Sequence, residues 1–274
     1  MNSIWTHWHP HHEVLLGLGL LELAYFIGIG PLRKRYKLSD QADPRQTATF
    51  TVGVLVIFLS LVSPLHVLSD QYLFSAHMLQ HVLLTLVAPP LLILGTPGWL
   101  LRRLMRPDLV FRTAKIVTHP VPAFVTFNLI FAMSHLPTLY NLSVTNHSLH
   151  VVEHLVFITT AVLMWFPIAS TVAEIKRLPY PLQMVYLFLM SLAQVIVFAP
   201  ITFSNVPLYQ WYVDAPQIWS ISTLVDQQIG GIIMKIGSGL IFMTLLIVVF
   251  FRWFEKEETN TRSELSDVEY SYAE

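Results

Sequence analysis

The sequence contains no cysteine in its 274 residues. Disulfide bonds, thiolate catalysis and cysteine-ligated metal ions or clusters are therefore excluded. A metal ion would have to bind through His, Met, Asp or Glu. Charged residues are also scarce: they make up 12% of the chain, about half the fraction of an average soluble protein. The 16 Lys and Arg nearly balance the 17 Asp and Glu, which gives no indication of a nucleic-acid partner.

Most of the chain consists of long apolar runs. Hydrophobic residues make up 54% of it, and the mean hydropathy is +0.58. Each run is close to the ~20 residues that a membrane-spanning helix needs. The seven runs are Val14–Leu32, Ala48–Leu65, Tyr72–Leu94, Pro122–Leu142, Leu149–Ala169, Leu182–Ile201 and Gln228–Trp253. We therefore predict an all-α integral membrane protein, a bundle of seven transmembrane helices that crosses the lipid bilayer of the cell membrane several times.

Positive charge is distributed unevenly along the chain. All Lys and Arg except Lys235 lie in the loops after the first, third and fifth runs or at the C-terminal end of the chain, from Arg252 onwards. Because basic loops stay in the cytoplasm, this predicts an N-terminus outside and a C-terminus in the cytoplasm. The predicted parts are an extracellular His-rich segment, residues 1–12, a transmembrane domain, residues 13–253, and a charged, disordered cytoplasmic tail, residues 254–274.

Two histidines, His77 and His81, lie inside the third apolar run, one helical turn apart. This spacing puts both imidazoles on one face of a helix. An ionisable group at membrane depth is expensive, so it normally faces a polar cavity or a partner rather than lipid. Pro89 and Pro90 follow in the same run and are expected to kink or break its helix.

Further histidines are expected at the same depth. His150 and His154 repeat the spacing in the fifth run with Glu153 beside them, and His135 falls near the outer end of the fourth. Imidazole is the commonest metal ligand and suits copper, zinc and iron. Alternatively, buried imidazoles hydrogen-bond neighbouring helices and stabilise the bundle. Two pairs and a fifth histidine at one depth favour a metal site, formed by His77, His81, His135, His150 and His154.

A polar motif, Asp226-Gln227-Gln228, opens the seventh run and is followed by Gly230 and Gly231. Asp226 is expected either to cap this helix or to act at the metal site, as a ligand or as an acceptor that orients an imidazole. The glycines would permit close helix packing.

Two charged residues, Glu22 and Lys235, lie inside the first and seventh runs. Burial of either charge alone costs several kcal/mol, on the order of the penalties measured for unpaired ions, so we predict an ion pair between the two helices. The competing interpretation makes Glu22 a proton or metal relay.

Three methionines, Met78, Met133 and Met234, are predicted at a depth similar to that of the histidines. Thioethers select Cu(I) over zinc, so they favour copper weakly; methionine is also ordinary filler of a helix bundle. Two segments outside the runs complete the candidates. The first is the N-terminal group of histidines, which would bind metals promiscuously: His7, His9, His11 and His12. The second is the WYVDAPQIW loop, Trp211–Trp219, which is typical of an interfacial aromatic belt.

Several of these motifs resemble one known family. FSAHMLQHVLLTLVAPPLLILGTP, the SHLP and EHL pieces and DQQIGGIIMK are similar to the multi-span CtaG family of bacterial cytochrome c oxidase assembly factors, across residues ~13–253. The resemblance implies a role in the maturation of haem-copper oxidase through copper insertion into a subunit. It also implies that five residues are functional: His77, His81, His135, His154 and Asp226.

The leading hypothesis is thus a non-catalytic factor that binds copper near the outer face and assists its insertion into an apo cytochrome c oxidase subunit. The alternative is a membrane-embedded zinc hydrolase with a His/Asp site, which needs three protein ligands and an activated water, with Glu153 as the best candidate base. A haem b carrier is a third alternative. The sequence leaves the oligomeric state open, a homo-oligomer included.

Overall fold

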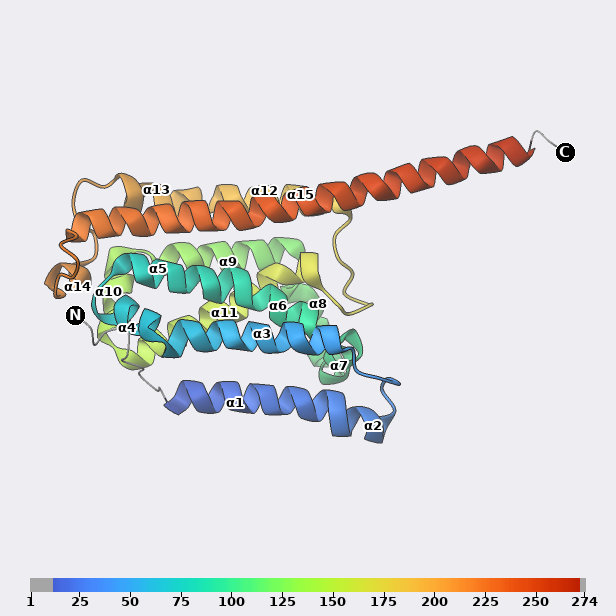
Figure 1. The fold of residues 1–274 in the computed structure, drawn as a ribbon, viewed down its shortest axis with the longest axis horizontal. Helices are drawn as coiled ribbons and strands as arrows, with labels where there is room; N and C mark the ends of the chain where they lie inside the picture. Colours follow the sequence, from blue (N-terminus) through green and yellow to red (C-terminus); the bar gives the residue numbers. More distant parts are fainter. Residues whose placement is uncertain (1–11, 272–274) are drawn as a thin grey trace.

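The computed structural model describes the backbone of residues 12–271, and every regular element in that range is a helix (Figure 1). The all-α prediction is therefore confirmed for this part of the chain. The elements of the first half are α1 (His12–Ile27), η2 (Gly28–Leu32), α2 (Arg33–Tyr36), α3 (Pro44–Val62), α4 (Pro64–Gln71), α5 (Phe74–Val82), η3 (Leu83–Val87), α6 (Ala88–Gly95), α7 (Gly98–Leu104) and α8 (Asp108–Val117). Those of the second half are α9 (Pro120–Ser134), α10 (Pro137–Thr145), α11 (His147–Ala169), α12 (Tyr180–Ala193), α13 (Val195–Phe203), α14 (Gln210–Asp214) and α15 (Thr223–Ser271).

Six helices in the described range are long and apolar enough to cross a membrane. Together they make the chain a multi-pass membrane protein. A pair of shorter helices, α8 and α9, would add one more span if it is counted as one, but the two are bent by 70° at their junction. The predicted count of seven spans therefore stays a prediction. The six are His12–Tyr36, Pro44–Val62, Phe74–Gly95, His147–Ala169, Tyr180–Phe203 and Thr223–Arg262.

The fourth predicted span differs from the structure. The continuous helix expected over Pro122–Leu142 is divided into α9 and α10, with His135 and Leu136 between them. Pro137 explains the division, because a proline disfavours helical backbone in the residue before it and begins a new helix readily. With 15 residues, α9 is about 22 Å long, which is shorter than the hydrocarbon core of a bilayer.

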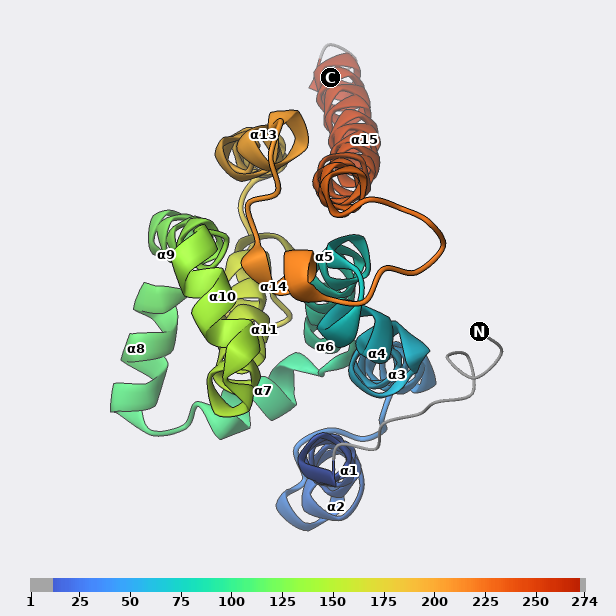
Figure 2. The same cartoon turned by 90° about the vertical axis from the view of Figure 1, so that its left-hand side faces the viewer.

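The bundle has two distinct ends. The histidine end consists of α4, α10, α14 and the first turns of α5, α11 and α15; the basic end consists of α2, α7 and the 170–179 loop (Figure 1). Figure 2 looks onto the histidine end and shows α5 and α11 in the middle, with α3, α9 and α15 around them. Both histidine pairs thus lie on central helices. The predicted orientation, with the histidine end outside, remains a prediction from loop charge.

A kink or a break was predicted at Pro89 and Pro90; the helix is distorted just before them but does not break. Proline has no N–H, so Pro89 leaves the carbonyl of Thr85 without its helical donor. The chain widens into the π-turn η3, and Trp165 Nε1 of α11 donates to that carbonyl at 2.9 Å. The span therefore continues from Phe74 to Gly95, and an indole from a neighbouring helix replaces the lost bond.

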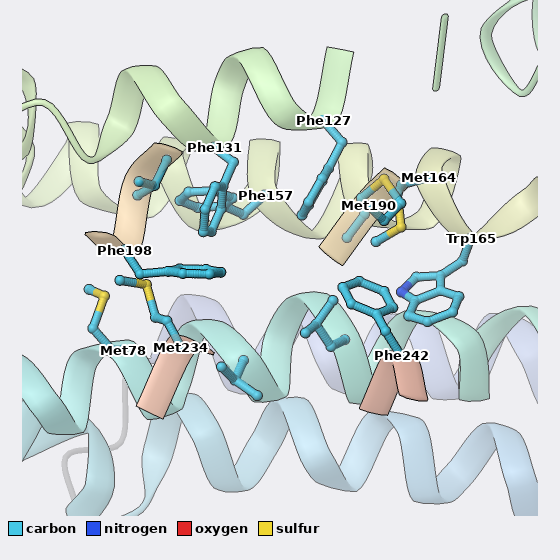
Figure 3. Close-up of a cluster of buried hydrophobic side chains, with 14 of the residues drawn as sticks. Met78, Phe127, Phe131, Phe157, Met164, Trp165, Met190, Phe198, Met234 and Phe242 are labelled. Atoms are coloured by element: carbon cyan, nitrogen blue, oxygen red, sulfur yellow. The ribbon is translucent and has the colours of Figure 1, made fainter. Parts of the chain in front are cut away.

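The main hydrophobic core lies between α5, α9, α11, α12, α13 and α15. Met78 and Met234 belong to it, both nearly inaccessible, and Figure 3 shows them next to Phe198. Met133, by contrast, is 46% exposed and points away from the core. The methionines predicted near the histidines are therefore packing residues in this structure, and they give copper no further support.

The predicted ion pair between Glu22 and Lys235 does not form. Glu22 accepts a hydrogen bond from Thr51 Oγ1 at 2.6 Å, and the Lys235 ammonium lies 5.7 Å from the centre of the Phe198 ring. The reason is topological: α1 packs on α3 at one side of the bundle, whereas α15 packs on α5, α12 and α13 at the other (Figure 1).

The prediction of a disordered C-terminal tail is wrong over most of its length. Helix α15 continues past the last apolar residues and ends at Ser271, so it extends far beyond the other helices (Figure 1). Glu, Lys and Arg are good helix formers, and Glu258 pairs with Arg262 one turn later. The charge pattern therefore stabilises a helix here.

One close helix contact gives a test of the fold. A side chain at Gly95 would place its Cβ 2.3 Å from the backbone nitrogen of Phe50 on α3. Because the contact is with a backbone atom, only a shift of one helix away from the other could relieve it. Gly95→Ala should lower the midpoint of thermal unfolding by several degrees, as a clash of roughly 1–3 kcal/mol predicts. Gly19→Ala is the matched control: nothing lies within 4 Å of its Cβ, so its midpoint should stay or rise. Equal midpoints for the two variants would contradict the α3–α6 packing.

Candidate metal centre

The first histidine pair lies on α5, which begins at Phe74. His77 and His81 point from the same face, their ring centres are 4.3 Å apart, and their Nε2 atoms are 2.9 Å apart. Both side chains are buried, at 0% and 2% exposure. The sequence prediction that these two imidazoles share one environment is therefore confirmed.

A third imidazole, His154 of α11, completes a cluster. One ring nitrogen from each of His77, His81 and His154 lies within 4.8 Å of the others. Two imidazoles bound tetrahedrally to one ion at about 2.0 Å would have nitrogens roughly 3.3 Å apart. Shifts of about an ångström or less in rotatable side chains would therefore bring this trio to that geometry. We call His77, His81 and His154 the histidine trio.

Several buried nitrogens around the trio have no hydrogen-bond partner. They are His77 Nδ1, His81 Nδ1, His135 Nε2, His150 Nδ1, His150 Nε2 and His154 Nε2. A buried polar atom left unpaired costs about 1–3 kcal/mol, and such atoms are rare in native proteins. A cation bound to the lone pairs of these nitrogens would satisfy them, so the donor set fits a metal ion.

His135 lies beside the trio and is held by the end of α9. Its Nδ1 donates to the carbonyl of Phe131 at 2.7 Å, which fixes the tautomer and leaves a lone pair on Nε2. The ring centre is 5.7 Å from that of His81. His135 is therefore arranged like a metal ligand, although its ring nitrogens lie farther from the trio's nitrogens than these lie from one another.

His150 occupies the outermost position of the cluster. Its ring centre is 4.4 Å from His154 and 5.3 Å from His77. Glu153 lies next to it: its Oε2 is 3.5 Å from His150 Nδ1 and accepts a hydrogen bond from Ser143. Residues at i and i+3 are neighbours on a helix, which explains the contact.

Asp226 makes hydrogen bonds that the sequence did not predict. Its Oδ2 accepts from the backbone N–H of Phe74 at 2.7 Å, and Oδ1 accepts from the N–H and the hydroxyl of Ser75. Asp226 thus caps α5 from α15 rather than capping its own helix, and it is not part of the group whose ligand atoms converge. A carboxylate at a helix N-terminus is favourable, and this one anchors the helix that bears the first histidine pair.

The rest of the motif joins α15 to its neighbours. Gln227 accepts from Leu208 N–H at 2.6 Å, and Gln228 donates to the carbonyl of Ser204 at 3.1 Å. A Cβ on Gly230 would approach Phe74 of α5, and one on Gly231 would approach Thr202 of α13. The prediction of close packing at these glycines is confirmed, and neither glutamine reaches the trio as a direct partner.

Aromatic residues cover the trio on the side of the histidine end, and sequence reasoning placed them elsewhere. The loop predicted as an interfacial belt keeps Trp219 exposed but buries Tyr212, whose hydroxyl donates to Ser69 O at 2.7 Å and lies 3.0 Å from Tyr140 Oη. Burial raises the pKa of Tyr212 well above its ordinary value of 10.0, so the hydroxyl remains a donor at any physiological pH. Tyr209 donates to the carbonyl of His135 at 2.9 Å.

A second missed group lies between the two histidines of α5. Gln80 is fully buried; it donates to Ser60 O at 2.7 Å, accepts from Ser69 Oγ at 3.0 Å and lies 3.1 Å from His66 Nδ1. These bonds tie α5 to α3 and α4. The signal in the sequence was a glutamine within an apolar run.

The comparison with known proteins bears on this arrangement. The model of one family, the cytochrome c oxidase caa3 assembly factors (Caa3_CtaG), matches residues 23–256. This chain belongs to that family. The matched region contains the histidine trio, His135, His150 and Asp226, so the whole cluster lies within the part of the chain that the CtaG family shares.

Two curated relatives are similar over most of this CtaG-family chain. They are uncharacterized proteins of Mycobacterium bovis and Mycobacterium tuberculosis, each 24% identical over 278 residues. The similarity covers 93% of this chain but only 40% of each relative, so the chain spans less than half of their length. No solved structure matches this chain.

Proposed function

We propose that this assembly factor binds copper with the histidine trio and assists its insertion into an apo subunit of cytochrome c oxidase. Membership of the CtaG family supports a role in oxidase assembly. The convergence of three buried imidazoles supports metal binding and is the observation on which the proposal depends. Copper is the cargo here. In a chain without cysteine, imidazole is the ligand best suited to hold it.

The trio suits a cargo site because its ligands are few and come from only two helices, α5 and α11. His135 lies next to His81 with a lone pair on Nε2, so a fourth ligand is within reach of a small movement. Exchange of ligands one at a time lets an ion move on without a bare intermediate.

A zinc hydrolase would use the same three-histidine ligand set. The space around the trio does not favour it. In the described residues, a pocket of about 90 Å³ reaches His154 and a void of about 10 Å³ reaches His81, whereas substrate sites usually measure about 300–1,000 Å³. Glu153, the candidate base, accepts a hydrogen bond from Ser143 and lies 3.5 Å from His150 Nδ1. A haem would have to separate rings that pack directly on one another.

Elemental analysis of purified protein tests the proposal. The wild type should contain about one copper per chain, and His81→Ala should lose at least nine-tenths of it, because removal of a direct ligand costs more than the 10–100-fold loss typical of outer partners. His119→Ala is the matched control, since this exposed histidine lies at the junction of α8 and α9, away from the trio. Stoichiometric zinc with hydrolytic turnover would overturn the copper assignment, and a strong Soret band would indicate haem.

A further inference from the structure

The histidine trio is buried, at 0%, 2% and 6% exposure, so a metal ion needs a route to it. The aromatic cover of Tyr140, Tyr209 and Tyr212 closes the direct approach from the histidine end. A route therefore has to pass between helices, and the polar groups that line it should be ones that a cation can bind in succession.

One pocket meets this requirement. It lies between α1, α4 and α11, has a volume of about 90 Å³, and reaches His154 at its inner side. The volume is enough for a metal ion with a few water molecules but too small for an organic substrate. The pocket is lined on its polar side by Glu13, His66, Asp70, His147, His150 and His154, and no lysine or arginine is among its described lining residues.

The lining groups form a series from the surface inwards. The side chains of His147 and Glu13 are 65% and 51% exposed and lie 3.3 Å apart. Asp70 is 36% exposed, and His150 beside it only 7%. The next imidazole inwards is His154, a member of the trio, with its ring centre 4.4 Å from that of His150.

The centre of the series is the pair of Asp70 and His150. Asp70 Oδ1 lies 3.9 Å from His150 Nε2, too far for a hydrogen bond but within the ~4 Å that separates two ligands on opposite sides of one ion. Both ring nitrogens of His150 are buried without a hydrogen-bond partner. An unpaired imidazole next to a carboxylate is the arrangement that a passing cation would complete.

We propose that this pocket is a cation-docking station, in which Asp70 and His150 receive a metal ion from the surface and pass it to the histidine trio through His154. The inference rests on the proposed function, because it assigns the route by which the trio is loaded. The station attracts cations by charge and releases them easily, since one partly exposed carboxylate and one imidazole bind an ion more weakly than three buried imidazoles.

The rate of loading tests this route. Cu⁺ is supplied anaerobically to the purified full-length protein as a complex with a coloured chelator, and the absorbance change gives both the rate and the final copper content. Asp70→Asn should slow loading about tenfold, within the range that electrostatic steering contributes, and Asp70→Glu should restore it. Val151→Trp, which fills the pocket, should slow loading further, and in each case the trio should fill in the end.

The matched control is Asp214→Asn, a carboxylate at the same end of the bundle that does not line the pocket, and it should load like the wild type. If Asp70→Asn and Val151→Trp load at the wild-type rate while the trio still binds copper, the route is wrong and the proposed function stands. If the wild type binds no copper, the proposed function fails and the route fails with it.

Discussion

Cells that carry His77→Ala or His154→Ala in place of the wild-type chain should lose cytochrome c oxidase activity, while the variant protein remains in the membrane at its normal level. Each substitution removes one of three converging ligands. The loss of metal affinity should therefore exceed the 10–100-fold loss that follows when a residue that only orients a ligand is removed. The fold should persist, because most of the core lies deeper in the bundle, around Trp165 and Phe127 (Figure 3).

Three measurements separate the site from the scaffold. Oxidase activity in membranes gives the function, the copper content of the purified oxidase gives the insertion step, and an immunoblot gives the level of the variant. His119→Ala should leave all three unchanged. Full copper loading of the oxidase in cells with the His77→Ala/His154→Ala double variant would show that these imidazoles only stabilise the bundle.

Asp226→Ala should weaken copper binding about 10–100-fold without removing a ligand, the range observed when residues that orient ligands are lost. Asp226 accepts backbone hydrogen bonds from Phe74 and Ser75, one turn before His77. Without this carboxylate the first turn of α5 frays, and both imidazoles of the helix lose their fixed position. Stability should fall too, because a hydrogen bond to a charged group contributes about 1.5–3 kcal/mol.

Copper titration and thermal unfolding distinguish the roles open to Asp226. Gln228→Ala is the matched control from the same motif: its side chain contacts Ser204 on the side away from α5, so it should reduce stability slightly and leave copper affinity unchanged. A loss of affinity in Asp226→Ala no larger than that in the control would exclude a positioning role. A complete loss, like that of His77→Ala, would instead make Asp226 a ligand.

The parts of the site that could be predicted from the sequence are those that depend on one helix. The spacing of His77 and His81 fixes their common face whatever surrounds them, and the same holds for His150 and His154. The depth of these pairs follows from the length of each apolar run. Their convergence needed one further condition, that α5 and α11 be neighbours, and no local pattern states it.

Three of the corrections concern partners that are distant in the sequence. Asp226 binds the first turn of a helix 152 residues earlier, a pairing that its local N-cap pattern hides. An ion pair between Glu22 and Lys235 was predicted because each is a charged residue within an apolar run. In the structure Glu22 contacts Thr51, and Lys235 lies over the ring of Phe198. The break at Pro89 was avoided because Trp165 could replace the lost donor, which depends on a side chain from another helix.

Helix α15 contains 49 residues and is therefore about 73 Å long, more than twice the ~30 Å of hydrocarbon that it has to cross. If its first turn lies at one membrane surface, its last turns stand about 40 Å clear of the lipid on the other side. A protein that recognises those turns would meet this chain at a height comparable to the diameter of a small soluble domain, on the side of the bundle opposite the histidine trio.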